Sequence, residues 1–153
     1  MAGRGVSHEG VLLTAVNKQV FVALVLVHLG VVGVHSAAHV ALGIVPGTVD
    51  SAFIVGVIVA GPLVAALVLR SRPTLGLALL GAFLLASFAY GIDNHFLTTG
   101  PDRLSVLMSE PWTGVFVVTA VALAALEIVG GLLALTVAAL RIRIPSGPAR
   151  PPA

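Results

Sequence analysis

Four long apolar segments constrain the fold of this chain more than any other feature of its sequence. We place them at residues 20–45, 51–69, 74–97 and 113–140. Each has about the 20 residues that an α-helix needs to cross the roughly 30 Å hydrocarbon core of a bilayer. Helix-ending sequences such as Pro46-Gly47 and Arg72-Pro73 separate them. The sequence therefore predicts an all-α, multi-pass membrane protein, a bundle of four transmembrane helices.

Composition agrees with this class and narrows the chemistry. Hydrophobic residues make up 58% of the 153 residues and charged residues 9%, with a mean hydropathy of +1.12. These values are typical of integral membrane proteins and not of soluble domains. The chain has no cysteine, which excludes disulfides, thiolate metal sites and iron–sulfur clusters. Any metal would be held by histidine, carboxylate or carbonyl groups.

Basic residues indicate which way the helices cross. With four spans, both termini and the connection near residue 71 lie on the same side of the membrane. Seven basic residues fall on that side and one on the other: Arg4, Lys18, Arg70, Arg72, Arg141, Arg143 and Arg150 against Arg103. Because Lys and Arg are enriched in cytoplasmic loops, we expect both termini to be cytoplasmic, with the chain in the cell membrane.

The sequence divides into three parts under this interpretation. Residues 1–19 are a cytoplasmic lead-in that could include an interfacial helix. Residues 20–140 form the transmembrane domain, and its first span is too long, and lacks the cleavage site, to be a removed signal peptide. Residues 141–153, rich in proline, are expected to be a disordered cytoplasmic tail.

Three histidines lie on one face of the first predicted span. Because an α-helix turns by about 100° per residue, His28, His35 and His39 fall within about 40° of one another. An imidazole in hydrocarbon needs a polar partner, and ionisable residues of membrane helices face the bundle interior or a water-filled cavity. This stripe therefore predicts a metal, cofactor or proton site.

Two of these histidines are expected at the same height as polar residues of the third span, although the sequence does not determine whether the two spans are in contact. His35 and His39 have the i, i+4 spacing that can clamp one metal ion. At about 1.5 Å per residue, they lie at the same height as Asp93 and His95, in the outer half of the membrane. Polar residues of the third span share a further face, which comprises Ser87, Tyr90, Asn94 and Thr98. We therefore predict an outward-opening pocket with Tyr90 and Asn94 in its wall, although a helix leaving the membrane would also carry such polar residues.

Two kinds of cofactor fit these side chains. His35 or His39, together with His95, could be axial ligands of a b-type haem. Alternatively, His35, His39 and His95 supply nitrogens to iron, copper or zinc. The Asp93 carboxylate would then be a further ligand, or would accept a hydrogen bond from one of the ligands. The i, i+4 spacing is a weak signal alone, and the same histidines could be interhelical hydrogen-bond partners without any ligand. The sequence leaves these alternatives open.

Glu127 is the acidic residue placed deepest in a predicted span. It shares a helical face with small residues, namely Ala120, Ala124, Gly131, Ala134 and Ala138. Small residues let membrane helices approach closely, so Glu127 should point into a helix contact, with His28 or a residue near it as the partner. A carboxylate and an imidazole in contact can share a proton, which makes His28 and Glu127 candidates for a proton relay.

Three functional hypotheses follow. The leading one is binding of a transition metal or haem b in the outer half of the bundle, for electron transfer. The second is a component of proton-coupled transport that uses His28 and Glu127. The third is an accessory subunit without cofactor that packs in the bilayer against another membrane protein or a second copy of this chain. No phosphate loop, nucleophile elbow or dinucleotide fingerprint occurs, so no catalytic residue is assigned and enzymatic activity is left open. A net charge of +2 gives no reason to expect nucleic acid as a partner.

Overall fold

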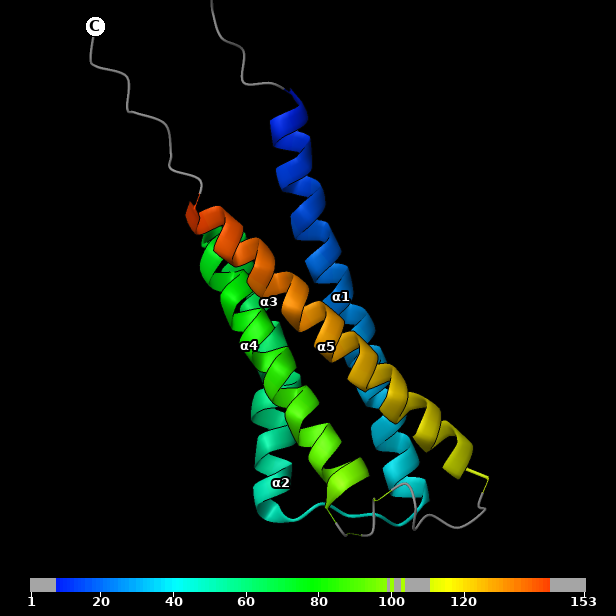
Figure 1. The fold of residues 1–153 in the computed structure, drawn as a ribbon. Helices are drawn as coiled ribbons and strands as arrows, with labels where there is room; N and C mark the ends of the chain where they lie inside the picture. Colours follow the sequence, from blue (N-terminus) through cyan, green and yellow to red (C-terminus); the bar gives the residue numbers. More distant parts are fainter. Residues whose placement is uncertain (1–7, 99, 101–102, 104–110, 144–153) are drawn as a thin grey trace, which may run out of the picture.

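The chain folds into long helices that run along a common direction (Figure 1). This computed structural model describes residues 8–98, 100, 103 and 111–143. Its elements are α1 (His8–Ala41), α2 (Thr48–Phe53), η1 (Ile54–Ala60), α3 (Gly61–Ser71), α4 (Pro73–Ile92), η2 (Asp93–Leu97) and α5 (Thr113–Arg143). Consecutive elements join into four helices long and apolar enough to cross a membrane: Lys18–Ala41, Thr48–Ser71, Pro73–Leu97 and Thr113–Arg143. The all-helical class with four such helices is confirmed.

The first span ends earlier than the sequence predicted. It was expected to continue to residue 45, but α1 ends at Ala41. Gly43 adopts a positive φ of 69°, which glycine tolerates because it has no Cβ. Its N–H donates to the carbonyl of Val40 at 3.1 Å, and the N–H of Ile44 donates to the carbonyl of His39 at 2.9 Å. These two bonds form a Schellman motif, so the chain turns at Gly43, four residues after His39.

Two segments are π-helical. η1 lies directly before Gly61 and Pro62, and proline has no N–H to donate to the preceding turn. The helix therefore accommodates Pro62 with a π segment, a known response to a broken hydrogen-bond ladder. η2 ends the third span, and there the N–H of Thr98 donates to the carbonyl of Asp93 at 2.7 Å. η2 contains His95.

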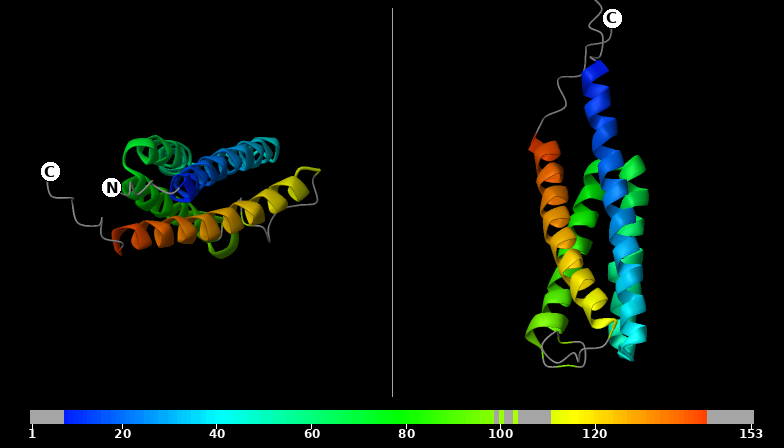
Figure 2. Two further views of the ribbon diagram at one scale, coloured as in Figure 1. Left: turned by 90° about the horizontal axis from the view of Figure 1, so that it is seen from above. Right: turned by 90° about the vertical axis from the view of Figure 1, so that its right-hand side faces the viewer.

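α5 packs against α4 and α1, and α3 packs against α4 (Figures 1 and 2). α4 and α5 approach each other closely at Gly81 and Gly131. A Cβ placed on Gly81 would lie 2.5 Å from the Cγ atom of Leu135 and 3.0 Å from the carbonyl oxygen of Gly131. The small-residue face predicted around Glu127 thus forms a helix contact. The adjoining apolar core comprises Phe21, Val25, Ala65, Leu69, Leu77, Leu80, Leu84, Ala134 and Ala138.

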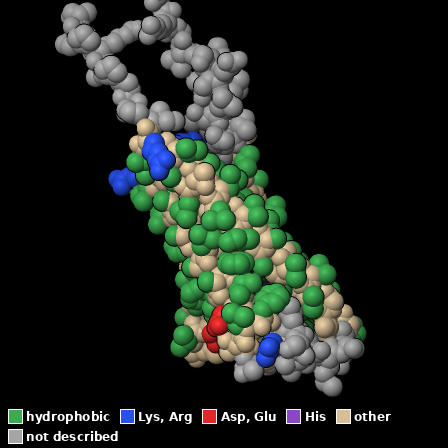
Figure 3. Space-filling view, viewed as in Figure 1, with side chains coloured by type: hydrophobic (Ala, Val, Ile, Leu, Met, Phe, Trp, Pro, Cys, Tyr) green, Lys and Arg blue, Asp and Glu red, His purple; other side chains and the backbone are tan. Residues whose placement is uncertain are grey.

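The start of the first span and the end of the second lie at one end of the molecule. Lys18 Nζ donates to the carbonyl of Arg70 at 3.3 Å. The C-terminal end of α5 lies at this same end (Figure 1). Hydrophobic side chains cover the length of the visible face, with Lys and Arg at its ends (Figure 3). Residues 1–7 and 144–153 of the predicted lead-in and tail are outside the described residues, as are Asp102 and Glu110.

Candidate metal centre

Three histidines from two spans converge on one point. Nε2 of His35 lies 3.1 Å from Nε2 of His39 and 3.2 Å from Nε2 of His95. The three ligand nitrogens all lie within 4.8 Å of one another. His35 and His95 are buried, and His39 is half-buried. The structure thus brings together the histidines that the sequence placed at equal height on the first and third spans.

Thr119 of α5 holds the ring of His35. Its hydroxyl donates to the carbonyl of Val115 at 2.7 Å, and the carbonyl of Phe116 lies 3.0 Å from the same hydroxyl. Because a hydroxyl has one proton, Oγ1 is left to accept from the Nδ1–H of His35, 2.8 Å away. The proton of neutral His35 is then on Nδ1, and Nε2 presents its lone pair to the other two histidines. Such a hydrogen bond behind a ligand is typical of histidines that bind metal ions.

Phe116 covers the histidine group on one side. Its ring centroid lies 4.7 Å from that of His35, 4.8 Å from that of His39 and 5.1 Å from that of His95. The side chain is 0% exposed and belongs to a small apolar cluster with Ala38 and Ile44. The turn at Gly43 returns Ile44 to this cluster. The packed rings limit how far each imidazole can rotate.

Two of the three nitrogen–nitrogen distances match those around one metal ion. With metal–nitrogen bonds of about 2.1 Å, two neighbouring ligands of a tetrahedral ion lie about 3.4 Å apart and those of an octahedral ion about 3.0 Å apart. The two Nε2–Nε2 distances, 3.1 and 3.2 Å, lie between these values. Imidazole nitrogens suit zinc, copper, iron and nickel, whereas magnesium and calcium require oxygen ligands. The group could therefore hold a transition-metal ion with three ligands and a position open for a fourth.

A cavity of about 490 Å³ adjoins the histidine group. All three histidines line it, together with apolar side chains from four elements, such as Val32, Ile54, Ile58, Phe88 and Leu123. It extends from Gly47 and Gly100, at the loop end of the bundle, to Glu127. A largely apolar cavity of several hundred cubic ångströms with a few converging polar groups is the usual form of a small-molecule site.

The four polar residues that the sequence placed on one face of the third span all line this cavity: Ser87, Tyr90, Asn94 and Thr98. The hydroxyl of Tyr90 donates to Asp50 Oδ1 at 3.1 Å, and the side-chain amide of Asn94 donates to the carbonyl of Tyr90 at 3.0 Å. The ring of Tyr90 also stacks on Phe53 of α2, with centroids 4.6 Å apart. These contacts join the second and third spans at the mouth of the cavity.

Asp93, predicted as a ligand or as an acceptor behind the ligands, lies elsewhere. Its side chain is exposed, and its Oδ1 accepts a hydrogen bond from the hydroxyl of Thr98 at 2.9 Å. Residues two positions apart on a helix point about 200° apart, so Asp93 faces away when His95 faces inward. The group that the structure assembles comprises His35, His39 and His95.

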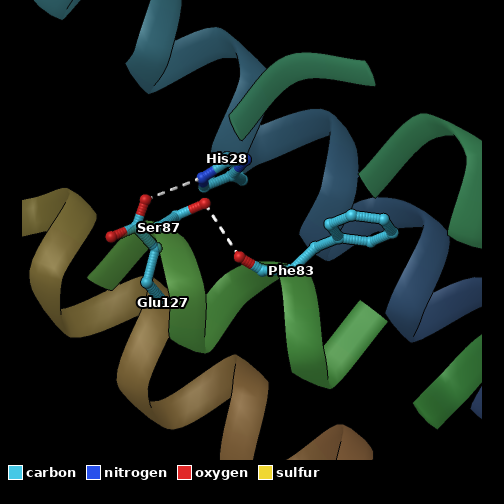
Figure 4. A network of polar contacts seen from close by, with 4 residues as sticks. All are labelled: His28, Phe83, Ser87 and Glu127. Carbon is cyan, nitrogen blue, oxygen red and sulfur yellow. Dashed lines mark hydrogen bonds and ion pairs between the residues drawn. The ribbon is translucent and has the colours of Figure 1, made fainter. Parts of the chain in front are cut away.

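His28 and Glu127 form a separate buried pair, as Figure 4 shows. Nε2 of His28 lies 3.0 Å from Oε1 of Glu127. His28 is 0% exposed and Glu127 is 4% exposed. Ser87 of α4 lies beside them, but its hydroxyl donates to the carbonyl of Phe83 at 2.9 Å. The contact predicted between His28 and Glu127 is present.

Thr119 and Phe116 are the residues of this site that the sequence did not single out. Both lie in the first two turns of α5, before Glu127. On a helix Phe116 falls within about 20° of Glu127, and Thr119 within about 80°. Extending the polar and small-residue face of Glu127 towards the start of the helix would have found both.

Comparisons of this chain with protein families, curated proteins and solved structures found no match.

Proposed function

We propose that this protein spans a membrane with four helices and binds one divalent transition-metal ion through Nε2 of His35, His39 and His95. The observation that carries the proposal is the convergence of the three imidazoles, at 3.1 and 3.2 Å from His35. The hydrogen bond from His35 Nδ1 to the Thr119 hydroxyl supports the proposal, because it leaves the lone pair of His35 on Nε2, which faces the other two nitrogens. Three histidines with one open position are a common ligand set of catalytic zinc.

The geometry favours a single ion over haem b. Two axial imidazoles of one haem lie on opposite faces of the macrocycle, with their nitrogens roughly 4 Å apart at metal–nitrogen bonds of about 2 Å. Nε2 of His35 lies within 3.2 Å of both His39 and His95. With any two of these rings as axial ligands, the third would occupy space that the macrocycle needs. A single ion has no such conflict.

Membrane insertion with cytoplasmic termini is part of the proposal. The described helices expose large apolar side chains along their length, among them Val40 at 78%, Val55 at 64% and Val118 at 67%, and lipid would cover them. Arg70, Arg72, Arg141 and Arg143 would then be cytoplasmic, and the cavity would open on the outer side. A cysteine-accessibility scan tests this: outer-side reagents should label Thr48→Cys, and only permeabilised cells should show labelling of Ser71→Cys.

Elemental analysis of the purified protein tests the metal site. We expect about one zinc, copper or iron ion per chain, and loss of the ion in His35→Ala and in His95→Ala. His8→Ala is the matched control, because position 8 precedes the first span, which begins at Lys18, and the substitution should leave the metal content unchanged. Full metal content in both site variants would contradict the assignment. Copper or iron would support electron transfer, whereas zinc does not change its oxidation state.

A second candidate function is proton-coupled transport of the bound cation. The observation in its favour is that the cavity lined by the histidine group reaches Glu127, which is paired with His28. Protein reconstituted into vesicles should then give cation flux that depends on a pH gradient and disappears in Glu127→Gln. Cation flux that does not depend on the pH gradient would contradict proton-coupled transport, and so would the absence of flux in protein that binds the metal. Metal binding would then remain as the function.

A further inference from the structure

The cavity connects the metal centre with the buried pair of His28 and Glu127. His35, at the metal centre, and Glu127, the partner of His28, both line it. His28 precedes His35 by two helical turns, so the two groups are separated by about 10 Å along α1. A charge at one group acts on the other across a mostly apolar space in which electrostatic interactions are stronger than in water.

Few groups near the Glu127 carboxylate could balance its charge. The described residues that line the cavity include no Lys or Arg. Its other titratable lining groups are His35, His39, His95, Asp50 and Tyr90. Asp50 and Tyr90 bond to each other at the mouth, and the hydroxyl of Ser87 donates to Phe83 (Figure 4). His28 is therefore the group that faces the Glu127 carboxylate within hydrogen-bond distance.

From this arrangement we infer that the cation at the histidine group and the proton held between Glu127 and His28 displace one another. The inference rests on the proposed metal site. With its proton, the pair has no net charge; without it, the pair carries one negative charge. Binding of a divalent ion lowers the free energy of the negative form, so the proton leaves to water through the cavity. By linkage, protonation of the pair weakens cation binding by the same factor.

The expected size of this effect follows from Coulomb's law. A divalent ion and a unit charge about 10 Å apart, at an effective dielectric constant of about 20, interact strongly enough to change an affinity on the order of 100-fold. Water that enters the cavity would reduce this value. We therefore expect Glu127→Gln, which removes the negative form, to weaken Zn²⁺ binding by at least about tenfold at alkaline pH.

Proton release on Zn²⁺ binding tests the inference. The full-length protein in detergent, weakly buffered, is titrated with Zn²⁺ at several values between about pH 5 and pH 8, the interval in which imidazoles change charge. Wild type should release up to one proton more per bound ion than Glu127→Gln at some pH in this interval. Asp50→Asn is the matched control, because it removes another carboxyl group of the same cavity and should release as many protons as wild type.

The outcomes separate this inference from the proposed function. Wild type that binds no stoichiometric Zn²⁺ would overturn both. Zn²⁺ binding with equal proton release from wild type and Glu127→Gln at every pH would overturn the coupling alone. The coupling would also be overturned if Asp50→Asn reduced proton release as much as Glu127→Gln does.

A second measurement applies if Glu127→Gln does not fold. Infrared difference spectra of wild type labelled with isotopic glutamate, recorded with and without Zn²⁺, should show a label-sensitive change in the carboxyl region. The chain's other glutamates, Glu9 and Glu110, lie outside the four spans. An unchanged glutamate signal in protein that binds Zn²⁺ would contradict the displacement of the proton.

Discussion

Nδ1 of His35 and the hydroxyl oxygen of Thr119 lie 2.8 Å apart, although 84 positions separate the two residues. This hydrogen bond joins α1 to α5 at the centre of the histidine group. Because the Thr119 hydroxyl donates its proton to a backbone carbonyl of α5, its oxygen accepts the hydrogen bond from the imidazole. The bond therefore sets which nitrogen of His35 is available to a metal ion.

Replacing Thr119 by valine should weaken the metal site without abolishing it. The variant keeps the shape of the side chain but cannot hold the His35 ring, and loss of such a support costs about 10–100-fold in metal affinity. Competition with a chromophoric chelator measures this change. Thr119→Ser keeps the hydroxyl and should bind as wild type does. Equal affinity of the valine variant would show that Thr119 does not orient the ligand.

Asp93→Asn should leave metal affinity and stoichiometry unchanged. The Asp93 side chain is exposed and bonds to Thr98, away from the three imidazoles. Isothermal titration with Zn²⁺ gives both quantities, and His95→Ala in the same titration shows what loss of a ligand does. A drop in affinity comparable to that of His95→Ala would show that the Asp93 carboxylate is a metal ligand.

Much of this site could be predicted from helical spacing, and the remainder depended on local backbone geometry. The periodicity of the first span put His35 and His39 on one face, and the rise per residue put His95 at their height. Equal height does not fix the direction of a side chain, which is why Asp93 was expected beside His95. The helical face of Glu127 could have pointed to Thr119, but its hydrogen bond with His35 joins residues 84 positions apart, which no local pattern reveals. The turn at Gly43 ended the first span early because one glycine adopted a positive φ.

Bound metal should be lost as the pH falls. Only neutral imidazoles bind metal ions, so protons compete for the same nitrogens. The fraction of Zn²⁺ bound should be highest at neutral to alkaline pH, decrease through the acidic range and recover when the pH is raised again. Equilibrium dialysis followed by elemental analysis measures it. Binding that persists unchanged at about pH 5, below the usual pKa of imidazole and above that of a carboxyl group, would point to carboxylate ligands instead of histidine.

Gly81→Ala should destabilise the contact between α4 and α5. The new Cβ would lie 2.5 Å from Cγ of Leu135, and overpacking of this kind costs about 1–3 kcal/mol. Gly33→Ala is the control, because nothing lies within 4 Å of a Cβ at that position. Thermal unfolding in detergent should show a lower midpoint for Gly81→Ala alone. Equal midpoints would mean that the helices separate at little cost.

X-ray absorption spectroscopy of the zinc-loaded protein tests whether His35, His39 and His95 bind one ion together. We expect three imidazole nitrogens at about 2.0–2.1 Å from zinc and one further light ligand. In His35→Ala the imidazole signature should disappear together with the bound zinc. A zinc shell of oxygen atoms without imidazole, or the same imidazole shell in His35→Ala, would contradict binding of one ion by the three histidines.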